Sequence, residues 1–197
     1  MKKNAKSICA SYFFNNNWWT NGPDFLVVRG KETASLVEPL YRTWWFPREE
    51  DFGELFDFYQ KRHDQLATIS YSEAKTYASL VLMLGGALVS GDRISHLNDK
   101  GLELLQKVLT AETAPGRPLN LCQDPLSKIW VQKLASGRTR IGLFNWEDES
   151  QTVKMDLKEL GVEGSNTARD FWTGEQVSIP ANSEFDLHPR SSQVLEF

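Results

Sequence analysis

Two aspartates stand where a carboxylate could hold a ligand. Asp24 follows the turn Asn21-Gly22-Pro23, and Asp92 follows Ser90-Gly91 at the end of a short apolar run. A carboxylate accepts hydrogen bonds, so each side chain could bind ligand hydroxyl groups or fix a neighbouring loop. For Asp24 we favour capping or orienting the loop, because Asp stabilises turns of this composition. For Asp92 both roles stay open.

Paired tryptophans are the second set of candidate residues. The chain contains seven Trp and eleven Phe, with Trp18 and Trp19 in "NNNWWTNGPDF" and Trp44 and Trp45 in "YRTWWFPREEDF". Indole has a flat apolar face and one N–H donor, which suits both cores and surfaces that stack on sugars. We expect core packing for Trp18 and Trp19, with Trp19 as the one that could line a pocket. Trp44 and Trp45 lie in a loop-like segment and could form a lid over a substrate or contact a partner subunit.

Metal, cofactor and disulfide chemistry have little support in the sequence. Cys9 and Cys122 are the only cysteines and are far apart, and His63, His96 and His188 share no ligand-like spacing. The glycines of "GKETAS" and "LMLGGAL" do not form a phosphate-binding loop. We therefore predict no metal ion and no cofactor.

Composition predicts a soluble globular protein. The 197 residues include 22 basic and 26 acidic side chains, a net charge of -4 that gives no electrostatic reason to bind nucleic acid or an anionic membrane. The N-terminus lacks the apolar stretch of a signal peptide, and the longest apolar run, 80–89, is too short to cross a bilayer. The compartment stays open.

The first part of the chain alternates short apolar strands with helical segments. Residues 25–28 and 87–90 read as buried strands, while 70–84 and 98–110 have apolar side chains at helical spacing. Strand, helix, strand, helix with short connections predicts a parallel α/β architecture for residues 1–114. The segment 31–67 fits this alternation poorly and is interpreted as an insertion on the loop side of the sheet.

The second part has a different pattern. A Pro- and Gly-containing connection at 114–118 is followed by short alternating runs separated by turn compositions such as "SGR" and "EDES". Short strands at this spacing with no helix between them predict an antiparallel β-sandwich over residues 119–197.

Five segments, in order, resemble the C-terminal part of the melibiase-type alpha-galactosidases of glycoside hydrolase families 27 and 36. They are "WWTNGPDFLVVRG", "LVLMLGGALVSGDRISHLNDKGLELLQ", "LNLCQDPL", "RIGLFNWEDES" and "ARDFWTGE". The family's Ser-x-Asp strand end is matched by Ser90 and Asp92, whereas Gly22 replaces the first Asp of its Asn-Asp-Pro-Asp turn. The resemblance covers the chain apart from 31–67.

The resemblance implies a fold of two classes, α/β plus all-β. Residues 1–114 would be the C-terminal remnant of a (β/α)8 barrel, contributing strands seven and eight, and 119–197 the antiparallel β-sandwich. Asp92 would lie at the end of the last barrel strand, where barrel enzymes place functional groups. The family's two catalytic aspartates come from earlier strands, so the resemblance implies an inactive chain that holds part of a pocket for α-linked galactosides.

The resemblance also leads to expectations about partners and leaves alternative functions open. A remnant with two barrel strands would leave apolar faces uncovered, so we expect self-association, docking on the missing barrel half, or cover from the segment 44–58. One alternative is a non-catalytic carbohydrate-binding or interaction module built on the β-sandwich. Another is a truncated product without a function of its own.

Overall fold

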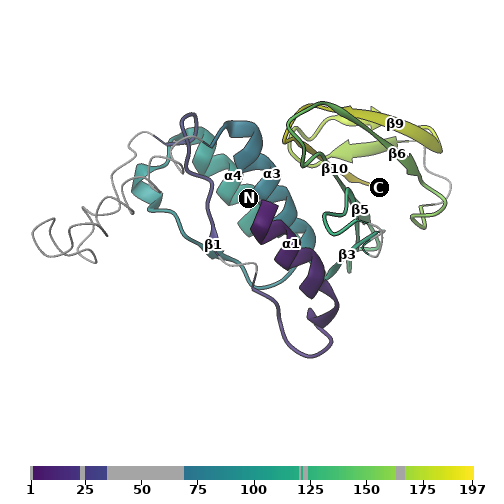
Figure 1. The fold of residues 1–197 in the computed structure, drawn as a ribbon, viewed down its shortest axis with the longest axis horizontal. Coiled ribbons are helices and arrows are strands. Elements are labelled where there is room, and N and C mark those ends of the chain that lie inside the picture. Colours follow the sequence, from purple (N-terminus) through teal and green to yellow (C-terminus); the bar gives the residue numbers. More distant parts are fainter. Residues whose placement is uncertain (1, 23–24, 35–68, 120, 122–123, 163–166) are drawn as a thin grey trace, which may run out of the picture.

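The computed structural model describes residues 2–22, 25–34, 69–119, 121, 124–162 and 167–197. Helices gather on one side of the molecule and antiparallel strands on the other (Figure 1). The helical elements are α1 (Lys2–Ser11), η1 (Tyr12–Phe14), α3 (Tyr71–Leu84), η3 (Ile94–His96) and α4 (Asp99–Thr110). The predicted segment 31–67 lies, from residue 35 on, outside the described residues.

A short parallel strand pair forms the first sheet. Strand β1 (Phe25–Leu26) pairs with β2 (Val89–Ser90), with Leu26 opposite Ser90, and α3 lies between them in the chain. The parallel arrangement predicted from the sequence is confirmed, although each strand has two residues rather than four. Burial on both faces was predicted, and this was wrong for β2: Val89 is 51% exposed. No further strand pairs with β2 in the described part of the chain.

The predicted helices are confirmed together with their ends. Helix α3 begins with a capping box, in which the Ser70 hydroxyl accepts from the Glu73 N–H and the Glu73 carboxylate accepts from the Ser70 N–H. It ends at Gly85, whose φ of 66° lies in the left-handed region that glycine adopts without strain. Helix α4 has Asn98 as its N-cap. Local sequence therefore sets both helices.

Helix α1 was not predicted, because its sequence is mostly polar. Its buried residues are Ala5, Ile8 and Cys9, which lie three and four positions apart and so share one helical face. This narrow apolar stripe is the signal that the sequence contained. The helix is held by packing on that stripe rather than by propensity.

The antiparallel β domain is confirmed. A six-stranded sheet has the order β3-β4-β5-β10-β7-β8, and a two-stranded sheet pairs β6 with β9. The strands are β3 (Gly116–Pro118), β4 (Ile129–Lys133), β5 (Thr139–Phe144), β6 (Gln151–Asp156), β7 (Thr167–Asp170), β8 (Gln176–Ser178), β9 (Asn182–Leu187) and β10 (Ser192–Glu196). Strand β3 falls within the connection predicted at 114–118, so the sheet begins there.

Two apolar clusters make up the core of the part that the structure describes. One belongs to the β domain, with Val131, Ile141 and Leu195 among its members. The other contains α1, β1, α3 and α4 residues together with large side chains of the β domain. Those β-domain members are Leu126, Trp130, Phe144, Trp146, Trp172 and Val194. Helix α3 thus packs directly against β5 and β10, and a continuous core joins the two parts.

Candidate functional site

The carboxyl ends of β1 and β2 meet at Asp92. One carboxylate oxygen, Oδ2, accepts the backbone N–H of Val28 at 2.7 Å, and the other, Oδ1, accepts Arg29 Nη1 at 3.0 Å. Arg29 also donates to the Gly91 carbonyl at 2.8 Å, and the Gly91 N–H donates to the Leu26 carbonyl at 2.9 Å. Asp92 therefore joins the two loops that leave the strand pair.

This environment decides what the Asp92 carboxylate can do. Its side chain is fully enclosed, whereas that of Arg29 is 21% exposed. Both oxygens already accept from donors of the protein, and the guanidinium balances the negative charge. The geometry favours loop fixing, one of the two roles that the sequence left open for Asp92. Arg29, which the sequence analysis did not single out, is the more accessible member of the pair.

Three consecutive asparagines organise the opposite, amino end of the strand pair. The buried Asn15 amide donates to the Leu84 carbonyl at 2.9 Å and its oxygen accepts the Asn21 N–H at 2.9 Å. Asn16 has a φ of 61°, a left-handed conformation that asparagine tolerates, and Asn17 donates to the Phe13 carbonyl at 2.6 Å. Each asparagine thus shapes one part of this loop.

The adjacent tryptophans lie outside the core. Trp18 is 74% and Trp19 53% exposed, so the prediction of core packing for both was wrong. The physical reason is the asparagine-anchored turn, which fixes the backbone against α3 and leaves the rings outside. Trp19 stacks on Phe14 with ring centroids 4.8 Å apart, and its Nε1 donates to Asn21 Oδ1 at 2.8 Å.

The structure does not bring Trp19 and Asp92 together. Trp19 bonds to Asn21, whose carbonyl accepts the Ala87 N–H just before β2, whereas Asp92 follows the end of β2. The two side chains therefore serve opposite ends of the parallel pair. The other predicted site residues, Asp24, Trp44 and Trp45, lie outside the described residues.

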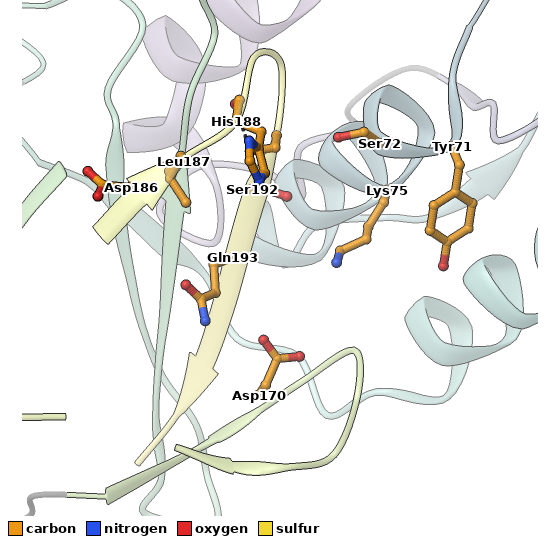
Figure 2. A pocket seen from close by; sticks show the side chains of 10 residues that line it. Tyr71, Ser72, Lys75, Asp170, Asp186, Leu187, His188, Ser192 and Gln193 are labelled. Atoms are coloured by element: carbon orange, nitrogen blue, oxygen red, sulfur yellow. Dashed lines mark hydrogen bonds between the residues drawn. The ribbon is translucent and has the colours of Figure 1, made fainter. Parts of the chain in front are cut away.

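A cavity of about 320 Å³ opens between α3 and the β domain (Figure 2). Its walls come from the first turns of α3, from the end of β7 and from the β9–β10 turn. The residues that line it include Lys75, Asp170 and Gln193. None of these residues was singled out by the sequence, because they are far apart in the chain and meet only through the packing of α3 on the sheet.

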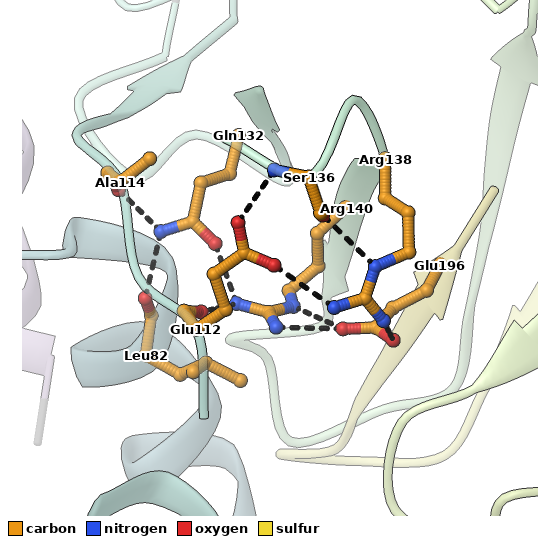
Figure 3. Close-up of polar contacts among 8 residues, drawn as sticks. All are labelled: Leu82, Glu112, Ala114, Gln132, Ser136, Arg138, Arg140 and Glu196. Carbon is orange, nitrogen blue, oxygen red and sulfur yellow. Dashed lines mark hydrogen bonds and ion pairs between the residues drawn. The ribbon is translucent and has the colours of Figure 1, made fainter. Parts of the chain in front are cut away.

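A second polar cluster ties the connection after α4 to the β domain (Figure 3). Arg140, 1% exposed, donates to Glu196 at 2.6 and 2.8 Å and to the Glu112 carbonyl at 2.8 Å. The Gln132 oxygen accepts Arg140 Nη1 at 2.7 Å, while its amide donates to the Leu82 carbonyl at 3.1 Å. A buried arginine whose donors are satisfied in this way is a structural clamp.

The Glu112 carboxylate marks the exposed edge of the same cluster. Hydrogen bonds from Ser136, together with Arg138, lower the pKa of Glu112 to about 2.

The thiol of Cys9 on α1 is buried in the core. Desolvation raises the pKa of this thiol to about 11, so Cys9 is protonated near neutral pH and is not poised as a nucleophile.

The described ranges contain neither a metal-binding cluster nor a membrane-spanning helix. No three His, Cys, Asp or Glu side chains there group closely enough to hold a metal ion. Among the helices that the structure describes, none is long and apolar enough to cross a membrane.

Sequence comparison identifies the β domain. Residues 125–197 match the family model of the alpha galactosidase C-terminal beta sandwich domain. The chain is 30% identical over 115 residues to a probable alpha-galactosidase D of Aspergillus niger, covering 53% of this chain and 17% of that protein. It is 27% identical over 119 residues to alpha-galactosidase D of Emericella nidulans, covering 56% and 18%. The chain thus spans under a fifth of the length of these relatives.

Structural comparison extends the likeness to the helical part. A family GH27 β-L-arabinopyranosidase from Geobacillus stearothermophilus, in complex with arabinose, superposes with a TM-score of 0.70 at 17% identity, covering 98% of this chain and 41% of that one. Alpha-galactosidase I from Mortierella vinacea superposes with a TM-score of 0.53 at 14% identity, covering 66% and 36%. Residues 125–197 are therefore an alpha-galactosidase C-terminal β-sandwich domain, in a chain that has the fold of the C-terminal part of GH27 proteins.

Proposed function

We propose that this chain is the C-terminal portion of an alpha-galactosidase-like glycoside hydrolase that acts on α-linked galactosides. In this proposal residues 1–114 supply strands seven and eight of a (β/α)8 barrel, β1 and β2, and residues 119–197 form the sandwich domain. The observation that carries it is the parallel β1–β2 pair connected through α3, in a protein whose other described strand pairs are antiparallel. The fold likeness over 98% of the chain supports the same assignment.

The galactoside part of the proposal comes from the curated relatives, which are named as alpha-galactosidases. The fold alone does not select a sugar, since the GH27 fold also belongs to a β-L-arabinopyranosidase. Within the proposal, Asp92 fixes the loops that border the sugar pocket, and Asp24, Trp44 and Trp45 remain candidate contacts. Trp19, which lies at the opposite end of the strand pair, is no longer one. Arg29 joins them as a group that could donate to a sugar hydroxyl.

The proposal gives this chain a supporting role in catalysis. A retaining glycosidase uses two carboxyl groups about 5–5.5 Å apart, one as nucleophile and one as acid/base. Asp92, the carboxylate at the ends of β1 and β2, is enclosed and paired with Arg29, so it can serve as neither without losing that pair. We therefore assign the chemistry to other barrel strands and expect the chain alone to be inactive.

An activity assay tests this assignment. The 197-residue chain is incubated with an aryl α-galactoside and, separately, with an aryl β-L-arabinopyranoside, each against a buffer control. We expect no hydrolysis of either substrate above that control. Hydrolysis that persists after repurification and disappears in Asp92→Asn would contradict the proposal, because the chain would then contain a complete catalytic site.

The exposed apolar side chains suggest where the rest of a barrel would dock. Val89, Ile94, Leu102 and Leu109 are between 37% and 58% exposed and belong to β2, η3 and α4, the elements at the open side of the strand pair. We propose that the remaining barrel covers this side, and that the isolated chain self-associates through it.

Sedimentation velocity tests the docking surface. We expect concentration-dependent association of the chain at micromolar concentration, weakened by Val89→Asp and Leu109→Asp. Phe13→Asp, a matched change of an exposed apolar residue near the asparagine loop, should leave association unchanged. A monomer at all concentrations, or equal effects of the three variants, would contradict this surface.

A carbohydrate-binding module built on the sandwich was the main alternative, and the aromatic residues do not favour it. Trp130, Trp146 and Trp172 are at most 6% exposed and pack in the core shared with α3. A stacking platform needs an accessible ring face, which these three do not offer.

A further inference from the structure

Four aromatic side chains gather on the loop that connects α1 to β1. The ring of Phe14 is at the centre of the group, with its centroid 4.8 Å from that of Trp19, 5.6 Å from that of Trp18 and 5.9 Å from that of Phe13. The three outer side chains are between 53% and 74% exposed. Figure 1 shows this loop extending away from the helices. These four rings, which we call the aromatic platform, are therefore an exposed apolar surface.

Hydrogen bonds fix both the backbone and one ring of the aromatic platform. The Phe14 carbonyl accepts the backbone N–H groups of Trp18 and Trp19 at 3.1 and 3.4 Å. The Trp19 ring donates through Nε1 to Asn21 Oδ1 at 2.8 Å, and the Asn21 amide in turn donates to the Ser11 carbonyl at 2.7 Å. Because these bonds form within the chain, a ligand meets rings that are already ordered. Binding to an ordered surface loses less conformational entropy.

The composition of the loop selects the charge of the ligand. Residues 11–22, "SYFFNNNWWTNG", include five aromatic side chains and four asparagines, and none of them is acidic, basic or histidine. A charged group that leaves water for this surface would find no opposite charge in the loop to compensate for the lost hydration. Amides donate and accept hydrogen bonds, as hydroxyl groups do. The loop is therefore complementary to a neutral ligand that contains hydroxyl groups.

Polar groups beside the rings remain open to such a ligand. Trp18 Nε1 and the side chain of Asn16 make no hydrogen bond with any residue in the described ranges. The exposed Asn16 lies next to the platform, because its backbone N–H donates to the Trp19 carbonyl at 2.8 Å. A pyranose has an apolar C–H face and hydroxyl groups around its rim. The face can stack on indole while the rim bonds to these open groups.

We propose that the aromatic platform binds a neutral oligosaccharide, with sugar rings stacked on Trp18 and Trp19. The centroids of these two rings are 6.3 Å apart and their planes are inclined by 73°, so a ligand of more than one sugar unit can contact both. The site lies at the amino ends of β1 and β2, opposite Asp92. It is separate from the strand ends assigned to a hydrolase pocket and does not depend on that assignment.

Ligand-observed NMR tests this site on the 197-residue chain. Saturation transfer from the protein is measured separately to maltotetraose, cellotetraose and β-1,4-galactotetraose, the neutral probes. We expect transfer to at least one of them, strongest at the C–H protons of one ring face. Tetragalacturonate is the charged probe and should bind more weakly than the galactose tetramer of the same length. The measurement remains usable if the chain self-associates.

Variants of the two tryptophans locate the binding. Trp18→Ala and Trp19→Ala should each weaken oligosaccharide binding about tenfold, because each removes an apolar ring that the sugar covers. Trp18→Phe keeps a flat apolar face and should retain most of the affinity. Trp18 is 74% exposed, so its variants should fold as the parent does, which circular dichroism checks. Leu109→Ala, at a 53% exposed apolar residue of α4, is the matched control and should bind as the parent does.

Three outcomes would overturn the proposal. The first is the absence of saturation transfer to all three neutral tetrasaccharides. The second is binding that neither tryptophan variant weakens, which would put the sugar elsewhere on the chain. The third is self-association that Trp18→Ala abolishes, without sugar binding by the parent, which would make the platform an interface between copies. Each of these results leaves the hydrolase assignment standing, because the activity assay tests that assignment separately.

Discussion

The two parts of this molecule close their cores in different ways. The β domain has an apolar cluster drawn from its own strands and turns, between Val131 and Leu195. The helical part has no such independence, because its cluster includes Trp130, Phe144 and Trp172 from the β domain. Without those three side chains the inner face of α3 would be uncovered.

The surface shows the same difference. Every large apolar residue found exposed in the described ranges belongs to the helical part, at positions 13, 18, 19, 89, 94, 102 and 109. The β domain covers its own apolar residues, whereas the helical part is covered on the sheet side and open on the β2 side. The sandwich therefore covers one side of the helical part, whose exposed apolar residues lie in η1 and the loop after it, in β2, in η3 and in α4.

The largest effect is expected at Trp172, which belongs to the sandwich in sequence but to the helical core in packing. Trp172→Ala should lower the free energy of unfolding by about 3–5 kcal/mol, and amide exchange in α3 should accelerate before that in β5. Urea unfolding and hydrogen exchange measure both. Trp18→Ala, at a 74% exposed ring, should change stability by less than about 0.5 kcal/mol. Similar losses in the two variants would remove the contrast between the two parts.

The second largest loss of stability is expected from a change at Arg140, the buried arginine that ties the connection after α4 to the β domain. Arg140→Met leaves Glu196, 8% exposed in its side chain, with Arg138 as its remaining cation. We expect a loss of about 3 kcal/mol in urea unfolding, at the lower end for a broken buried pair because Arg138 stays. Adding Glu196→Gln should recover part of it.

An exposed ion pair provides the control for this clamp. Lys154→Met removes the ion pair between Lys154 and Glu184, whose side chains are 79% and 60% exposed, and should cost far less stability than Arg140→Met because solvent screens the pair. A loss as large as that of Arg140→Met would mean that burial does not distinguish the two pairs.

A smaller effect is expected at the start of α3, which depends on local sequence. Ser70→Ala removes the acceptor for the Glu73 N–H, 3.2 Å away, and should destabilise the protein by about 1 kcal/mol. Ser70→Asp keeps an acceptor and should restore most of that loss. Thermal unfolding followed by circular dichroism compares the three proteins, and an unaffected Ser70→Ala protein would mean that packing alone fixes the helix.

The smallest expected effect is the pH dependence from Cys9, where α1 packs near the β domain. Burial raises its pKa from 9.0 to about 11, so the native state holds the thiol proton more tightly than the unfolded chain. Its stabilising contribution is complete below pH 9.0 and is lost as the pH rises from 9.0 through about 11. At pH 9.5 the loss should be below about 1 kcal/mol. Urea unfolding of Cys9→Ala should lack this component, and identical pH profiles would contradict the assignment.

Local signals in the sequence sufficed for part of this structure. Apolar side chains at helical spacing over 70–84 and 98–110 predicted both long helices, because this pattern depends on residues that are close in the chain. Alternation of apolar and polar residues predicted the antiparallel β domain. The boundary at 114–118 and the roles of the candidate site residues stay predictions.

Features that depend on distant contacts were not predictable in this way. Trp18 and Trp19 are exposed because Asn15 binds the Leu84 carbonyl, 69 positions away in the chain. Arg140 is enclosed by Glu196 and Gln132, which lie 56 and 8 positions away in the chain. The cavity lined by Lys75 and Asp170 forms only when α3 packs on the sheet. No residue spacing in the sequence therefore predicts it.

The shared core has a consequence for synthesis on the ribosome. Helix α4 ends at Thr110, whereas the last residue that the sandwich contributes to the helical core is Val194. At about 5–20 residues per second, roughly 4–17 s pass between these two residues during translation. Throughout that interval the inner face of α3 has emerged without its cover, which is a binding opportunity for a chaperone that recognises apolar helices. The helical part can therefore complete its core only after β10, the last strand to be synthesised, has been made.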